Sequence, residues 1–101
     1  MRVRFADKRL ERMYTHGEGA DQYPAGLTDV YLRRIRHIES ANDERDLRVP
    51  KSVHYERLKG KQWVGKDSMR LNKQWRLILS IENDQQGKFV QIHEINNHYG
   101  D

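Results

Sequence analysis

The stretch KDSMRLNKQWRLILSI, residues 66–81, decides the fold of this 101-residue chain. In its second half every other residue is apolar, namely Trp75, Leu77, Leu79 and Ile81. Ile78, which lies between two of them, is apolar as well. A period of two is typical of a strand, and an apolar residue on the second face indicates burial on both sides. The stretch therefore predicts a central strand of a sheet.

Further strands are expected on both sides of this central one. In residues 66–71, apolar Met69 and Leu71 alternate with polar Ser68 and Arg70, which is the pattern of a half-buried strand. Short polar stretches rich in turn formers separate the strands. The set expected in this half of the chain is strands at residues 53–58, 66–71 and 89–95, a tight turn at residues 72–73 and a loop at residues 83–87.

The first half of the chain predicts two helices after a short opening strand at residues 2–5. Asp7 is a favourable N-terminal cap for a helix to about residue 15, and Gly17 ends it because glycine adopts positive φ readily. A second helix is expected from about residues 25–29 to residue 41. One apolar stripe at helical spacing supports it, formed by Leu27, Tyr31, Ile35 and Ile38.

The order of these elements defines the expected fold class. A short strand, two helices and then a run of neighbouring strands predict an α+β domain, with the two N-terminal helices packed on one face of a twisted, mainly antiparallel sheet. The other face is then expected to carry the basic and polar side chains. A chain of 101 residues is enough for one domain, so we expect residues 1–101 to form a single unit.

Composition excludes several classes of protein. The chain has no cysteine, which excludes disulfides, thiolate metal sites and cysteine nucleophiles. No apolar run is long enough for a membrane helix, and the basic N-terminus has no apolar signal segment behind it. The five histidines do not show the spacing of a metal site. We therefore expect a cytoplasmic protein with no metal, no cofactor and no membrane partner.

Charge is concentrated in one part of the chain. The net charge is +4, but residues 51–76 hold eight Lys or Arg against two acidic residues, a local balance of +6. Such a segment favours binding to RNA, DNA or an acidic protein. The alternative is a solvated lysine-rich surface. Charge alone leaves both interpretations open.

Three of these cations, Lys59, Arg70 and Arg76, are expected on neighbouring strands, on the sheet face away from the helices. RNA cleavage requires a base for the 2′-hydroxyl, an acid for the departing 5′-oxygen and cations on the phosphate. Arginine fits the last role because its charge is permanent and its fork is planar. Trp63 lies between basic residues and has the aromatic face on which a base stacks. The alternative is a set of ordinary exposed sheet cations.

Three short motifs together resemble the HigB group of the RelE/ParE toxin superfamily. They are Asp46-Leu47-Arg48-Val49-Pro50, then Leu58-Lys59-Gly60, then the run from Ser68 to Arg76 that reads S-x-R-x-N-x-Q-W-R. Each motif alone is weak, but their order and spacing are specific. The two helices and the last strand are compatible with the same group, so the resemblance spans nearly the whole chain.

The resemblance implies a RelE-like fold and a toxin of a type II toxin–antitoxin pair. HigB-like members enter the ribosome and cut the bound mRNA without a metal, and a helix-turn-helix antitoxin of the HigA type is the implied partner. Two matched positions carry over as active-site residues, Lys59 and Arg76. ParE-like members share the fold and inhibit DNA gyrase, so that function stays as an alternative. A non-catalytic module that binds nucleic acid or protein is a third possibility.

The sequence departs from the family pattern where the acid and base are expected. Glu56 stands where a well-studied form of the motif has histidine, and Glu94-Ile95-Asn96 stands where the family often has Asp-Tyr-His. A His-Tyr pair follows later. The expected catalytic residues are therefore Arg76, Lys59, His98 and Tyr99, with Glu56 and His93 as substitutes for the last two. The expected substrate-binding residues are Arg70, Lys61, Lys73 and Trp63.

Overall fold

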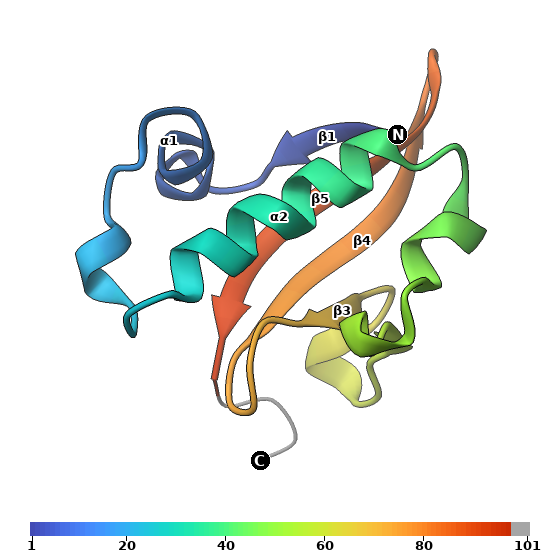
Figure 1. Cartoon of the computed structure of the whole chain (residues 1–101). Coiled ribbons are helices and arrows are strands. Elements are labelled where there is room, and N and C mark those ends of the chain that lie inside the picture. Colours follow the sequence, from blue (N-terminus) through green and yellow to red (C-terminus); the bar gives the residue numbers. More distant parts are fainter. Residues whose placement is uncertain (98–101) are drawn as a thin grey trace.

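The computed structural model describes residues 1–97 as a sheet of five strands with two helices on one face (Figure 1). The strands are β1 (Arg2–Phe5), β2 (Glu56–Arg57), β3 (Asp67–Arg70), β4 (Arg76–Asp84) and β5 (Gly87–Asn96), and the helices are α1 (Lys8–His16) and α2 (Leu27–Ser40). The strand order is β1-β5-β4-β3-β2; β1 is parallel to β5, and the other pairs are antiparallel. This confirms the predicted α+β architecture.

Both helices begin and end close to the predicted residues. The side chain of Asp7 accepts a hydrogen bond from the backbone N–H of Arg9 at 2.8 Å, and Gly17 closes α1 with φ of 72°. The hydroxyl of Tyr31 in α2 donates to the carbonyl of Leu10 in α1 at 2.8 Å, which ties the helices together. None of the helices in residues 1–97 is long and apolar enough to span a bilayer.

The core lies between α2 and the middle of the sheet (Figure 1). The apolar stripe of α2 packs against alternate residues of β4 and β5, as the sequence pattern predicts. Ile78 is also fully buried although it points to the opposite face, which agrees with a central strand apolar on both sides. The buried side chains of this core include Tyr31, Ile35, Ile38, Leu77, Leu79, Val90 and Ile92.

The loop predicted at residues 83–87 is a shorter turn in the structure. β4 and β5 form one hairpin that pairs Asp84 directly with Gly87 and leaves a turn of two residues. The carboxylate of Asp84 accepts from the N–H of Gln86 at 2.8 Å, and Gly87 adopts φ of 109°. Asn83, Asp84 and Gly87 of this polar stretch therefore belong to the strands, because a hairpin turn of two residues is enough to connect them.

The predicted strand at residues 53–58 is wrong, except for β2. Lys51–Val53 form a 3-10 turn, and His54 follows with φ of 45°, a left-handed conformation that interrupts an extended run. Only Glu56 and Arg57 pair with β3. Val53 and Leu58 are nevertheless buried, so their apolar character reflects packing of a loop rather than a strand.

The Asp46–Pro50 motif anchors this loop to the sheet. Arg48 lies over the ring of Tyr55 at 4.7 Å, and the Tyr55 hydroxyl donates to buried Asp67 at 2.5 Å. Burial and the bond to Asp67 raise the pKa of Tyr55, which keeps its donor proton in place. Arg57 Nε pairs with the other Asp67 oxygen at 2.6 Å. The Asp46–Pro50 motif thus positions the segment around Tyr55, which precedes the strands that carry Arg70 and Arg76.

Candidate active site

Arg76 is held by three different groups at the start of β4. Its Nε and Nη2 donate to the hydroxyl of Ser68 at 3.1 and 2.7 Å, and Nη2 also donates to the carbonyl of His54 at 2.6 Å. A carboxylate oxygen of Glu56 lies 3.2 Å from the same nitrogen. The Arg76 side chain is only 11% exposed. The result is a fixed guanidinium beside a carboxylate.

The turn between β3 and β4 sets this arrangement. The side-chain oxygen of Asn72 accepts from the backbone N–H groups of Gln74 and Trp75, both at 2.8 Å. Trp75 meets Tyr23 edge-on at a ring distance of 5.5 Å, so the turn is also attached to the loop before α2. These contacts fix the register that places Arg76 opposite Arg70. The S-x-R-x-N-x-Q-W-R motif therefore encodes one turn and the arginines on both sides of it.

Arg70 contacts His54, the loop residue that also contacts Arg76. Its Nε donates to the carbonyl of Asn72 at 3.2 Å, and its Nη1 lies 3.4 Å from Nε2 of His54. On the helix side, Arg34 donates to the Arg70 carbonyl at 3.0 Å. Met69 between Ser68 and Arg70 packs in the core, so strand alternation directs Arg70 away from the helices.

The same alternation in β4, where Leu77 and Leu79 are core residues, directs Arg76 away from the helices. The expectation that Lys59 lies on a neighbouring strand is wrong, because it follows the short β2 and lies exposed in a loop. The φ of 106° at Gly60 explains the glycine after this lysine.

Three of the remaining predicted residues lie in the turns before and after β3. Lys61 and Trp63 belong to a 3-10 turn before β3, where Lys61 is exposed and Trp63 is half-buried. Lys73 is exposed in the turn after β3. His98 and Tyr99 lie outside the described residues, so their predicted roles stay predictions.

Sequence reasoning missed the part played by Ser68 and by the backbone of His54. Ser68 is fully buried and accepts both bonds from Arg76, which explains why a serine opens the motif. Its position in the motif was a signal for this role. The His54 carbonyl offers none, because its direction depends on the left-handed backbone at that residue.

His93 forms a second polar group on this face of the sheet. Its Nε2 lies 2.7 Å from the hydroxyl of Ser80, which itself donates to Glu82 at 2.6 Å. Since the hydroxyl has one proton, His93 Nε2 must carry a hydrogen and donate. Burial, and next the charge of Lys66, lower the pKa of His93, while the carboxylates of Glu82 and Glu94 oppose the shift.

This group is separate from the arginine cluster. Ser80 lies four residues after Arg76 on β4, or about 13 Å at the usual rise of a strand. In the arginine cluster, the carboxylate of Glu56 lies close to the fixed cation of Arg76. A guanidinium and a carboxylate in this arrangement can hold a phosphate and accept a proton next to it.

Comparison with solved structures gives the class of the fold. A chain described as a YoeB/ParE toxin from Agrobacterium tumefaciens superposes with a TM-score of 0.63, covering 98% of this chain and 100% of that one. The sequence identity is 17%, so this likeness concerns the fold. The architecture is that of RelE/ParE-type toxins.

The sequence comparisons then give the family. A family model described as the RelE-like toxin of the type II toxin–antitoxin system HigB matches residues 3–93, and the chain belongs to this HigB-like family. It is 35% identical over 80 residues to "Toxin HigB-1" of Vibrio cholerae, which is 77% of this chain and 81% of that protein. It is also 35% identical over 100 residues to an uncharacterized protein of Haemophilus influenzae, with coverages of 99% and 89%.

Proposed function

We propose that this toxin is an endoribonuclease that cleaves mRNA bound to the ribosome, through attack of a ribose 2′-hydroxyl on the adjoining phosphate. The observation that carries the proposal is the fixed Arg76 with Glu56 at 3.2 Å. The family model adds support, because the chain belongs to a family of type II toxins. The proposed place of action is the cytoplasm, where translation occurs.

The proposed chemistry uses Arg76 as the cation on the phosphate. The 2′-oxygen forms a bond to phosphorus, the bond from phosphorus to the 5′-oxygen breaks, and a 2′,3′-cyclic phosphate and a 5′-hydroxyl result. Arg76 balances the charge that grows on the phosphate oxygens in the transition state. Glu56 takes the proton of the 2′-hydroxyl, since its carboxylate is next to the same guanidinium.

The departing 5′-oxygen needs a proton, and the proposed donors are His98 or Tyr99. Lys59 would assist Arg76 at the reacting phosphate. The flanking cations Arg70, Lys61 and Lys73 would contact RNA phosphates, and Trp63 would stack on a base. The proposed partners are the ribosome, its mRNA and a cognate antitoxin of the helix-turn-helix HigA type.

The test is cleavage of mRNA on programmed ribosomes by purified toxin, read by primer extension. Arg76→Ala should lower the cleavage rate by on the order of 10²-fold or more, because a transition-state cation is lost. Arg33→Ala is the matched control, since Arg33 is an exposed arginine of α2. Circular dichroism checks that both variants fold.

Expression in bacteria separates the proposal from its alternative. The wild type should arrest growth and produce cuts in translated mRNA, and Arg76→Ala should do neither. DNA breaks without mRNA cuts would contradict the proposal and favour gyrase inhibition. Binding of RNA without any cleavage by the wild type would favour a non-catalytic module.

A further inference from the structure

His54 contacts the two arginines of the candidate site with different parts of the residue. Its backbone carbonyl accepts from Nη2 of Arg76 at 2.6 Å, while Nε2 of its ring lies 3.4 Å from Nη1 of Arg70. The carbonyl contact helps to fix Arg76 for the proposed cleavage. The imidazole has no part in that cleavage, although it lies beside a cation at the same site.

The backbone of His54 does not explain why a histidine stands at this position. The residue has φ of 45° and ψ of 55°, a left-handed conformation that is uncommon outside glycine. Glycine adopts this conformation more readily and would present the same carbonyl to Arg76. The histidine side chain is also exposed, so it adds little to the packing of the core. We therefore look for a role of the imidazole itself.

Arg70 and Arg76 bring two positive charges to one place on the sheet. They are direct partners across the β3–β4 ladder, and side chains in such a pair have Cβ atoms about 4.5–5.5 Å apart. Arg76 has the carboxylate of Glu56 at 3.2 Å. In the described part of the chain no carboxylate pairs with Arg70, whose guanidinium contacts the carbonyl of Asn72 and the ring of His54. An anion is therefore the partner that this guanidinium lacks among those residues.

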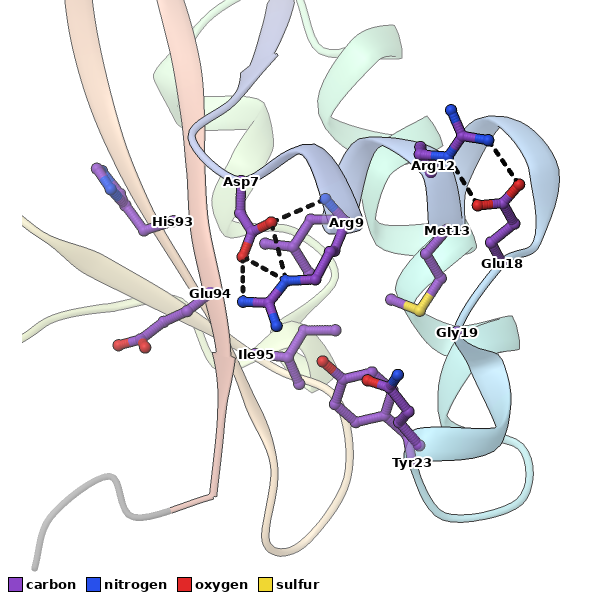
Figure 2. Close-up of a pocket in the computed structure, with 12 residues that line it drawn as sticks. Asp7, Arg9, Arg12, Met13, Glu18, Gly19, Tyr23, His93, Glu94 and Ile95 are labelled. Atoms are coloured by element: carbon purple, nitrogen blue, oxygen red, sulfur yellow. Dashed lines mark hydrogen bonds and ion pairs between the residues drawn. The ribbon is translucent and has the colours of Figure 1, made fainter.

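The arginines beside the pocket at α1 differ from Arg70 in this respect. This pocket of about 440 Å³ is lined by α1, by the loop after it and by β5 (Figure 2). Arg9 pairs there with Asp7 at 2.8 Å, and Arg12 pairs with Glu18 at 2.7 Å (Figure 2). An added anion would compete with a carboxylate at either of these arginines. Arg70 is therefore the more favourable place for an added anion.

An imidazole beside a guanidinium is suited to a phosphate. The guanidinium donates parallel hydrogen bonds to phosphate oxygens, and an imidazolium adds a donor and a positive charge. A neutral imidazole adds no charge, and histidine changes between the two forms in the range of about pH 5 to 8. The charged groups around the ring are Arg70 of β3, Arg76 of β4, Glu56 of β2, which contacts Arg76, and Lys51 at the start of the turn that ends at His54. Cations outnumber acids in this set, which favours an anionic ligand.

We propose that Arg70 and the protonated imidazole of His54 form a second phosphate site, which binds the RNA phosphate next to the one held by Arg76. The proposal rests on the proposed function, since that function makes RNA the substrate. Neighbouring phosphates of one strand are a few ångströms apart, as opposite side chains of a ladder are, so a single strand reaches both sites. The site holds RNA more tightly as the pH falls, because only the protonated ring carries a charge.

The salt dependence of RNA binding tests this second site. The probe is a fluorescein-labelled single-stranded RNA in which fluorine replaces every 2′-hydroxyl, so the proposed cleavage has no nucleophile. Fluorescence anisotropy gives the association constant at several salt concentrations, at about pH 6 and about pH 8. For a single strand, the slope of log K against log salt concentration changes by about 0.7 for each phosphate contact.

His54→Gly removes the ring and keeps the carbonyl that Arg76 uses. At pH 6 its slope should be smaller than that of the wild type by about 0.7, and at pH 8 the difference should nearly vanish. His54→Gln, which is neutral, should behave in the same way. His54→Arg has a permanent charge, so its slope should match the wild type at pH 6 and exceed it at pH 8. His16→Ala, at an exposed histidine of α1, is the control and should change neither slope.

Equal slopes for the wild type and both neutral variants at pH 6 would overturn the proposal. A difference of the same size at pH 8 would do so too, because it would show that the ring acts without its charge. Absence of wild-type binding at pH 6 and low salt would also overturn it. Circular dichroism checks the folding of each variant. The readout involves no cleavage, so a wild type that shows the expected slopes but cuts no mRNA on ribosomes would contradict the proposed function alone.

Discussion

Arg70 and Arg76 are direct partners across the β3–β4 ladder, and both contact His54. Arg76 donates to the His54 carbonyl at 2.6 Å, and the guanidinium of Arg70 lies 3.4 Å from the imidazole. Like charges directly opposite each other destabilise a sheet. A local cost of this kind is expected where a surface serves function rather than stability. The pair therefore supports a binding role for this end of the sheet.

Ser68→Ala should reduce cleavage without removing any charge. The hydroxyl accepts two bonds from Arg76, so its loss leaves the guanidinium less fixed and costs about 1–2 kcal/mol of unfolding free energy. The cleavage rate on programmed ribosomes should fall, and the drop should exceed that of Ser40→Ala, whose hydroxyl is exposed. Equal rates for the two variants would show that Ser68 has no part in positioning Arg76.

Asn72→Ala should destabilise the β3–β4 turn. It removes the acceptor for two backbone N–H groups, at a cost of about 1–2 kcal/mol of unfolding free energy. Asn72→Asp keeps the acceptor and should recover most of this loss. Urea unfolding measures both. Asn83→Ala, an exposed position of β4, is the control and should change the midpoint little.

Tyr55→Phe should cost more stability than Tyr14→Phe. The Tyr55 hydroxyl donates to buried Asp67, whereas the Tyr14 hydroxyl donates to the exposed carboxylate of Glu39. Removing a partner of a buried carboxylate costs about 1–3 kcal/mol, and an exposed bond costs less because water replaces it. Thermal unfolding compares the two variants. A larger loss for Tyr14→Phe would contradict the role assigned to Asp67.

His93 should make stability depend on pH below its ordinary pKa. Its pKa in the folded chain is lowered from 6.5, chiefly by burial and then by Lys66, so the unfolded state binds the proton more tightly. The associated stability is present above pH 6.5 and is lost as the pH falls from 6.5 through the folded pKa. His93→Gln should remove this part of the dependence in urea unfolding between pH 8 and pH 5, a range that brackets the unperturbed value by about 1.5 pH units on each side.

NMR titration of the His93 ring gives an independent check. Its midpoint should lie below 6.5, and the neutral form should carry its hydrogen on Nε2, where Ser80 accepts it. Glu82 and Glu94 oppose the shift, so Glu82→Gln should lower the midpoint further. A midpoint above 6.5 would contradict the burial of this ring.

The regular elements could be predicted because their local patterns agree with their tertiary environment. The apolar stripe from Leu27 to Ile38 and the alternation around Ile78 each match one period, and Asp7 and Gly17 mark the ends of α1. The strand predicted at residues 53–58 was wrong because Val53 and Leu58 are buried apolar residues, as in a strand, although they lie in loops. Their burial comes from contacts with segments distant in sequence, which a local pattern does not contain.

The candidate site was predictable only in part. The motif contained Arg70 and Arg76, and strand alternation gave their face of the sheet. The turn at Asn72 was predicted, but the bond from Arg76 to the backbone of His54 was not, because the direction of that carbonyl has no signature in the sequence. The catalytic roles of Lys59 and of the residues after Asn97 remain predictions.

The position of β5 in the sheet also has a consequence for the order in which the chain is made. β5 lies between β1 and β4, so the first strand synthesised has no partner until the last one has left the ribosome. The core residues Val90 and Ile92 belong to β5 and are therefore among the last to be synthesised. A nascent chain therefore cannot assemble the sheet that presents Arg76. Assembly of the complete sheet therefore has to wait until the residues of β5 have been synthesised.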